Sequence, residues 1–325
     1  MRLPVERWIE RWNAYWFPET TTLYLSITRI VMVATQLFWF FPKLERHLNL
    51  LEKNSEFINP QLLISGIAAL VSRETLFTPS TFTILYWITA VAGVAALVGL
   101  FTRVSLFVFS LGTWIFVAHA YSYGDRHHPE AVFAIILLAL SLAPAGESLS
   151  LDALIRRRAL PFIDRVKASV KVDTAMWPLK LAHVLLALTY FSTGMSKLIL
   201  GGPAWLNGYT LQNYTLGDAV SRDIPLGIWL GQQHRLAIGL SFFTILIETF
   251  FFVSLVLPWT APFIFLGALL FQIGLLVTAG HGFYQHMVLL VLLLFFIRPQ
   301  WWQAWRNKYV EHSRPPLTAS LIRSE

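Results

Sequence analysis

Long uninterrupted apolar runs dominate this 325-residue chain and constrain its fold more than any other feature. A helix that crosses a membrane needs roughly 20 consecutive apolar residues, because lipid cannot satisfy the backbone polar groups. Hydrophobic residues make up 56% of the chain and charged residues 13%, whereas soluble domains carry roughly 25% charged residues. The sequence therefore predicts an all-α polytopic membrane protein.

The apolar runs predict a bundle of about eight transmembrane helices. The predicted spans are 23–42, 81–101, 104–122, 130–145, 179–199, 236–257, 261–279 and 284–298. Residues 61–71 form a run that is too short to cross, which predicts a surface or re-entrant helix. Residues 1–22 place Trp8, Trp12 and Trp16 on one helical face, which predicts an amphipathic helix in the membrane interface. A helix packed on a partner is the alternative.

Basic residues between the runs predict the orientation. The loop 146–178 is rich in arginine and lysine, so the positive-inside rule makes it cytoplasmic. An even number of spans then places both termini in the cytoplasm, with one transmembrane domain over 23–298 and a basic cytoplasmic tail over 299–325. The net charge of +7 is a topology signal, because the cations lie in loops and form no nucleic-acid-binding patch.

The chain has no cysteine, which excludes disulfides, cysteine-ligated zinc and thiol nucleophiles. The candidate chemistry lies in ionisable residues inside the spans, which are costly to bury. Arg29 and Glu248 lie at similar predicted depths, which predicts a structural ion pair. His183, Tyr190 and Lys197 are spaced by seven residues and share one stripe of the fifth span. Lys197 either snorkels to the interface or faces an apolar pocket, where burial favours a neutral amine that acts as a base.

The predicted topology also brings several histidines to the outer membrane face that carries Lys197. These histidines are His119, His127, His128, His281 and His286. Scattered histidines that face solvent are one interpretation, and a metal site is another. No pair has the His-x-x-x-His spacing of a helical metal site and carboxylates are scarce, so no metal is expected.

Several of these segments resemble known families. The run Thr189–Leu198, followed by Pro203–Tyr209, resembles the segment of vitamin K-dependent γ-carboxylases that carries Lys-Leu, then Trp, then Gly-Tyr. The His127–His128 loop before an apolar helix is similar to that family's histidine-containing loop. Ser148–Leu154 resembles the bacterial HTTM (horizontally transferred transmembrane) domain proteins of the same superfamily. The resemblance covers residues 24–297.

The resemblance implies a membrane enzyme that uses a reduced quinone, such as vitamin K hydroquinone or menaquinol, with O2 and CO2 as co-substrates. By motif match, Lys197 is the base that deprotonates the hydroquinone, and His128 or His127 assists. Carboxylation of an acceptor at the outer face would follow. Aromatic side chains suit a flat quinone ring. The candidate quinone-binding residues are Tyr190, Trp205, Tyr209, His119, His281 and His286.

Two other functions stay open at this point. One is a non-catalytic subunit that binds quinone or lipid, similar in outline to DoxX-like proteins. The other is a proton-coupled transporter that uses Glu248, Arg29 and His183 as a relay, which should show inverted repeats. The expected partners are membrane lipid, a lipid-soluble quinone and a separate substrate or partner protein at the outer face, with no nucleic acid. The expected location is the bacterial inner membrane.

Overall fold

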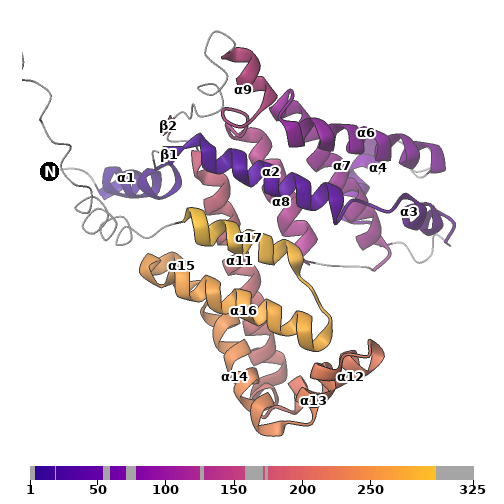
Figure 1. The fold of residues 1–325 in the computed structure, drawn as a ribbon, viewed down its shortest axis with the longest axis vertical. Helices are drawn as coiled ribbons and strands as arrows, with labels where there is room; N and C mark the ends of the chain where they lie inside the picture. Colours follow the sequence, from indigo (N-terminus) through magenta and orange to yellow (C-terminus); the bar gives the residue numbers. More distant parts are fainter. Residues whose placement is uncertain are drawn as a thin grey trace, which may run out of the picture. The chain divides into compact units, whose positions relative to one another are not determined.

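The computed structural model describes residues 4–18, 20–53, 59–70, 78–124, 128–157, 171–172 and 175–297 (Figure 1). The chain divides into two compact units. The first unit is Met1–Thr189 with Phe283–Leu289, and the second is Tyr190–Gly282 with Leu290–Glu325. Helices α11 and α17 contribute residues to both units. The predicted tail, 299–325, lies outside the described residues.

Helices make up nearly all of the described part of the first unit. They are α1 (Pro4–Trp16), α2 (Thr22–Phe38), α3 (Leu44–Leu51), α4 (Leu62–Leu70), α6 (Pro79–Val98), α7 (Thr102–Ser122), α8 (His128–Leu142), α9 (Leu151–Arg156) and most of α11 (Trp177–Ser196). Two short strands, β1 (Thr20–Thr21) and β2 (Lys171–Val172), pair antiparallel, with Thr20 opposite Val172. This pairing joins the start of α2 to the loop that the sequence assigns to the cytoplasm.

The second unit is also helical. It contains a π-helical turn (Lys197–Gly201), a 3₁₀ turn (Gly202–Trp205), α12 (Tyr209–Ser221), α13 (Pro225–Gly231), α14 (His234–Phe250), α15 (Val253–Val256), a 3₁₀ turn (Pro258–Thr260) and α16 (Ala261–Ala279). Helix α17 (Tyr284–Phe296) supplies its second half. Figure 1 shows α12 and α13 as a short helical pair that precedes α14.

Four helical segments in the described part of the chain are long and apolar enough to cross a membrane. They are Pro79–Val98, Thr102–Ser122, Trp177–Trp205 and Pro258–Ala279. Three shorter apolar helices occupy other predicted spans, at Thr22–Phe38, Pro129–Leu142 and Tyr284–Phe296. The predicted sixth span is interrupted, because α14 ends at Phe250 and a separate short helix follows. A helical membrane protein is confirmed, and the count of about eight spans stays a prediction.

The hairpin of α6 and α7 shows how small residues position these helices. Gly99 ends α6 in the left-handed conformation (φ 73°), which glycine adopts without a steric penalty. The two helices then run side by side (Figure 1). A Cβ atom on Gly112 would lie 2.0 Å from Oγ1 of Thr89, so only glycine permits this approach.

Helix α1 is present where the sequence predicts the amphipathic helix. Trp8 is 63% exposed and stacks on Trp12, with ring centroids 5.4 Å apart. Tyr15, at its other end, lies under the ammonium group of Lys180, which is 4.6 Å from the ring centroid. An exposed aromatic face is typical of helices that lie in a membrane interface, and that location stays a prediction.

Candidate functional site

Lys197 and Glu248 form the most buried ion pair among the described residues. The Nζ atom of Lys197 lies 2.5 Å from Oε2 of Glu248, and the two side chains are 20% and 6% exposed. Both residues belong to the second unit. Each charge in this shielded pair depends strongly on the other, because an unpaired buried charge is costly. The lysine singled out by the sequence therefore has a carboxylate in direct contact with it.

A glycine brings these two side chains together. Gly194 lies one turn before Lys197 on the same face of α11. A Cβ atom on Gly194 would lie 2.6 Å from the backbone nitrogen of Thr249 and 2.9 Å from the carbonyl carbon of Glu248. The backbones of α11 and α14 therefore touch at this point, as small residues allow between membrane helices. The lysine one turn further on then reaches Glu248.

The backbone around Lys197 departs from a regular helix. Helix α11 ends at Ser196 and continues as the π-helical turn Lys197–Gly201. π-Helical turns are rare overall, and many of those that occur lie at functional sites. The 3₁₀ turn that follows places the ring of Trp205 under the lysine, with Nζ 5.2 Å from the ring centroid. The ammonium group thus contacts a carboxylate and an aromatic face.

Tyr190 lies two turns before Lys197 and is buried within the second unit. Its ring stacks on Phe251 with centroids 4.6 Å apart, and its hydroxyl accepts a hydrogen bond of 2.8 Å from Nε2 of Gln272. The Oε1 atom of Gln272 is buried and has no hydrogen-bond partner within the described chain. This amide oxygen is an acceptor that a bound hydroxyl group can use, since buried acceptors are rarely left unpaired.

The sequence predicted that Glu248 pairs with Arg29, and the structure gives both residues other partners. Glu248 contacts Lys197. Arg29 is fully buried in the first unit, where Nη1 donates to the carbonyl of Ala145 at 3.0 Å and Nη2 to the carbonyl of Leu149 at 2.5 Å. The guanidinium group carries five donors in a rigid fork. A loop with several carbonyl acceptors therefore suits it better than a single carboxylate does. Arg29 thus secures the loop after α8.

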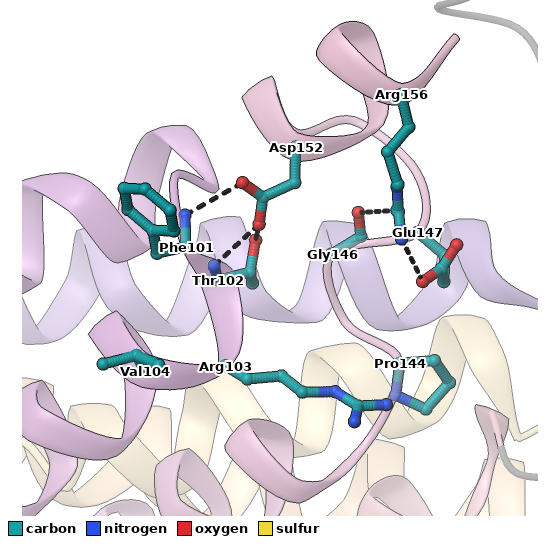
Figure 2. A pocket seen from close by; sticks show the side chains of 9 residues that line it. All are labelled: Phe101, Thr102, Arg103, Val104, Pro144, Gly146, Glu147, Asp152 and Arg156. Carbon is teal, nitrogen blue, oxygen red and sulfur yellow. Dashed lines mark hydrogen bonds and ion pairs between the residues drawn. The ribbon is translucent and has the colours of Figure 1, made fainter.

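The Ser148–Leu154 segment, noted for its resemblance to HTTM proteins, forms a second polar network beside Arg29. Ser150 caps α9 by accepting a 2.9 Å bond from the backbone of Ala153. Asp152 reaches across to the start of α7, where it accepts bonds from the backbone nitrogens of Phe101 (2.9 Å) and Thr102 (2.7 Å) and from the Thr102 hydroxyl (2.7 Å), as Figure 2 shows. These bonds satisfy helix-terminal donors that would otherwise lack partners.

The charge on Asp152 is stabilised by this arrangement. Burial alone would raise the pKa of its carboxyl group, but the bonds from Thr102 and Phe101 and the charge on Arg156 outweigh burial, so the pKa lies below its usual value. The same residues line an open pocket of about 450 Å³, where Arg156 binds Oε1 of Glu147 at 2.9 Å (Figure 2). The motif therefore has a structural role in joining α2, α7 and α9.

A buried pair of imidazoles lies elsewhere in the first unit. Nδ1 of His47, on α3, is 3.0 Å from Nδ1 of His119, on α7, so one ring donates and the other accepts. Phe82 and Phe116 pack against His47 at centroid distances of 6.3 and 4.8 Å. Burial, together with His119 and Arg46, lowers the pKa of His47 to about 3. His47 is therefore a neutral hydrogen-bonding group at neutral pH, and the sequence did not predict it because its partner is 72 residues away.

The other predicted histidines have separate surroundings. His281 contacts Oδ2 of Asp218 at 2.9 Å and Arg222 at 3.2 Å, at the surface of the second unit. His286 is buried in the first unit near the ring of Phe283. His127 lies outside the described residues, as does the side chain of His128, whose backbone begins α8. The proposed assistance of these two histidines to Lys197 stays a prediction.

Tyr209, a predicted wall of the quinone pocket, is exposed. Its side chain is 60% accessible and its ring stacks on His234, with centroids 4.3 Å apart. Of the predicted aromatic residues, Trp205 lies next to Lys197. Tyr190 lies in α11, the helix that leads into the turn containing Lys197.

The model of the HTTM domain matches residues 17–301, which is most of the chain. The chain belongs to the HTTM domain family. This is the domain found in vitamin K-dependent γ-carboxylase, so the family that the motifs indicated is confirmed, and the protein is a membrane protein of the carboxylase superfamily. Comparisons with curated proteins and with solved structures gave no significant match.

Proposed function

We propose that this HTTM protein is a membrane enzyme that deprotonates a lipid-soluble hydroquinone, with Lys197 as the base and Glu248 as its proton-sharing partner. The observation that carries the proposal is the contact of 2.5 Å between Lys197 Nζ and Glu248 Oε2 in a site mostly shielded from water. Membership of the carboxylase superfamily supports it. The reduced quinone, vitamin K hydroquinone or menaquinol, would supply the reducing chemistry, with O2 and CO2 as co-substrates and an acceptor at the outer membrane face.

The residues of the second unit fit such a ligand. Trp205 offers an aromatic face beside the amine, and aromatic faces suit flat rings. The unpartnered Oε1 of Gln272 offers an acceptor for a ligand hydroxyl. Lys197 supplies the proton acceptor, because a neutral amine in hydrogen-bond reach of a hydroxyl acts as a general base.

The pairing with Glu248 explains how Lys197 becomes an amine. An ion pair that loses its remaining water becomes less stable relative to its neutral form, because charges are costly in a low dielectric. A ligand that covers Lys197 therefore favours transfer of the ammonium proton to Oε2 of Glu248. The amine then takes the proton of a ligand hydroxyl, and the resulting ammonium group stays in contact with the site. Glu248 thus acts as a proton store next to the base.

Turnover of a reduced quinone by the purified protein in lipid nanodiscs tests this function. With menaquinol or vitamin K hydroquinone present, we expect oxygen uptake to fall by at least about 100-fold in Lys197→Ala, which is the usual contribution of a general base. Glu248→Gln should also lower the rate and shift its pH profile, because the amide cannot accept the proton. Lys53→Ala, which removes an exposed lysine of the first unit, is the matched control.

The controls separate chemistry from folding. Thermal unfolding of each variant in the same nanodiscs should show a folded protein, and Lys197→Met preserves side-chain length where Lys197→Ala fails to fold. Unchanged hydroquinone turnover in both lysine variants would exclude Lys197 as the base. Quinone binding without turnover in the wild type would instead support the non-catalytic, DoxX-like alternative.

A further inference from the structure

A pocket of about 270 Å³ in the first unit lies between the end of α2, the start of α3 and the middle of α7. We call it the α2–α3 pocket, and the residues that matter here are Gln36, Lys43, Arg46, His47, Thr113 and Glu130. It contains no residue of the Lys197 site. Its volume is slightly below that of drug-sized ligand sites, which begin at about 300 Å³, so it suits a smaller molecule.

Three buried polar side chains line this pocket, and one of them has an unsatisfied hydrogen-bonding atom. Oγ1 of Thr113 is buried and has no hydrogen-bond partner among the described residues. The amide nitrogen of Gln36 donates to the carbonyl of Phe40 at 2.9 Å, and the structure describes no partner for its oxygen. His47 lines the same pocket and contacts His119 through Nδ1. Buried polar groups in native proteins are nearly always satisfied, so the unpartnered Thr113 hydroxyl, with the polar side chains of Gln36 and His47 in the same pocket, indicates a polar ligand.

Charged side chains line the mouth of the pocket, whereas the buried groups described above are uncharged. Lys43 and Arg46, one turn apart along the start of α3, are both exposed. Glu130 also lines the pocket, and both it and Arg46 have further interactions. One carboxylate against two cations leaves the mouth positive. Lysine and arginine are the side chains that bind phosphate groups most strongly, through charge-assisted hydrogen bonds.

The pocket therefore presents a cationic mouth and a neutral polar floor. We propose that the α2–α3 pocket binds a phosphate ester that carries a free hydroxyl group a few bonds from the phosphorus. The phosphate would lie at Lys43 and Arg46, and the hydroxyl would bond to Thr113, Gln36 and His47. Such a group occurs in soluble glycerol 1-phosphate and in the headgroup of phosphatidylglycerol, and the exposed ring of Trp39 at the mouth would accommodate an attached acyl chain.

Binding measurements with three probes test the proposal. Wild-type protein in nanodiscs of zwitterionic lipid is titrated with glycerol 1-phosphate and with inorganic phosphate, and separate nanodiscs contain defined amounts of phosphatidylglycerol. We expect a saturable site for glycerol 1-phosphate, for phosphatidylglycerol, or for both, and at least about tenfold weaker binding of inorganic phosphate, which lacks the hydroxyl. Binding of the soluble ester alone assigns a soluble ligand, and binding of the lipid alone assigns a lipid. Inorganic phosphate that binds as tightly, or no binding by either ester, would overturn the proposal.

Thr113→Val gives a readout that a merely structural role would not give. Valine has nearly the same shape but no hydroxyl, so it removes an unsatisfied buried group from the empty protein and a hydrogen-bonding group from the complex. The variant should unfold at a higher temperature than the wild type without ligand and bind the ester about five- to tenfold more weakly. Unchanged affinity would contradict the proposal. Thr83→Val is the matched control, because Thr83 bonds to the Pro79 carbonyl outside the pocket.

Lys43→Gln tests the mouth. This variant should weaken ester binding by about three- to tenfold and reduce its salt dependence, because one charge-assisted contact is lost. Lys53→Gln, which neutralises another exposed lysine after α3, should leave binding unchanged. Equal effects of the two substitutions would show that the attraction is a general charge effect and would remove phosphate from the proposal.

Discussion

Single polar side chains hold the ends of the helices in the first unit. Arg29 donates to two carbonyls of the loop after α8, and Asp152 accepts three bonds at the start of α7. Each of these side chains satisfies backbone groups that no helix can satisfy internally. Such contacts matter more in a membrane protein, because lipid offers no hydrogen bonds in place of the missing ones.

Asp152→Asn should make the protein less stable by about 1 kcal/mol at neutral pH, because the amide keeps one acceptor oxygen and loses the charge. The pKa of Asp152 is lowered in the folded protein. Its contribution is therefore complete above the unfolded pKa of about 3.9 and is lost as the pH falls through the lower folded value. Chemical unfolding in detergent between pH 7 and pH 3 should show the two proteins converging in stability at the acidic end.

Glu147→Gln is the control for that substitution. Glu147 also accepts a bond from an arginine, Arg156, but their side chains are 32% and 53% exposed, so water weakens the pair. Exposed ion pairs contribute little, so this variant should match the wild type. A loss in Glu147→Gln as large as in Asp152→Asn would show that charge in the loop, and not the cap on α7, stabilises the unit.

At the scale of the elements, the contact between α11 and α14 decides the geometry of the candidate site. Gly194 lets the two backbones touch, and the helix then changes to a π-helical turn at Lys197. The stripe of residues spaced by seven was apparent in the sequence. The helix that packs against this stripe was not apparent in the sequence. Periodicity shows which face of a helix is buried but not which neighbouring helix covers it.

Gly194→Ala should separate α11 from α14. Alanine normally favours a helix interior over glycine by about 1 kcal/mol, but its Cβ would lie 2.6 Å from a backbone nitrogen of Thr249, and such overpacking costs about 1–3 kcal/mol. We expect a lower unfolding temperature and loss of hydroquinone turnover. Gly217→Ala is the control, since no atom lies within 4 Å of a Cβ there, and it should be neutral or slightly stabilising. A Gly194→Ala protein as stable and active as the wild type would contradict the close contact.

At the scale of the whole molecule, contacts within the first unit agree with the predicted topology. β1 pairs with β2, and Asp152 bonds to the start of α7. Asn59 donates to the carbonyl of Ser122 at 2.8 Å. In the predicted topology, each of these contacts joins two segments separated by an even number of spans, as contacts between segments on one membrane face require. The orientation itself rests on the loop charges.

Single-cysteine labelling tests that orientation, because the chain has no cysteine of its own. Gly217→Cys, at an exposed position of α12, should react with a membrane-impermeant maleimide added to intact spheroplasts. Arg157→Cys, just after α9, should react only after the membrane is permeabilised. Reversed labelling would place the loop 146–178 outside, and labelling of both positions from one side would contradict the single span, 179–199, that the topology predicts between them.

The sequence predicted the class of fold and the family. Apolar runs along the sequence show where membrane helices lie. The Lys197 segment and the Ser148–Leu154 segment carried the family resemblance that the HTTM match confirmed. The π-helical turn at Lys197 and the break after Phe250 were not predictable. Both depend on local backbone geometry that hydropathy does not report.

By itself, the sequence determined that the chain is helical, belongs in a membrane and places costly ionisable groups inside its helices. Only the tertiary structure decided their partners: Lys197 with Glu248, Arg29 with the carbonyls of Ala145 and Leu149, and His47 with His119. The physical reason is that a buried charge or imidazole must be satisfied by some group. Which group satisfies it depends on contacts between residues as far as 120 positions apart, and the spacing of residues along one helix does not determine those contacts.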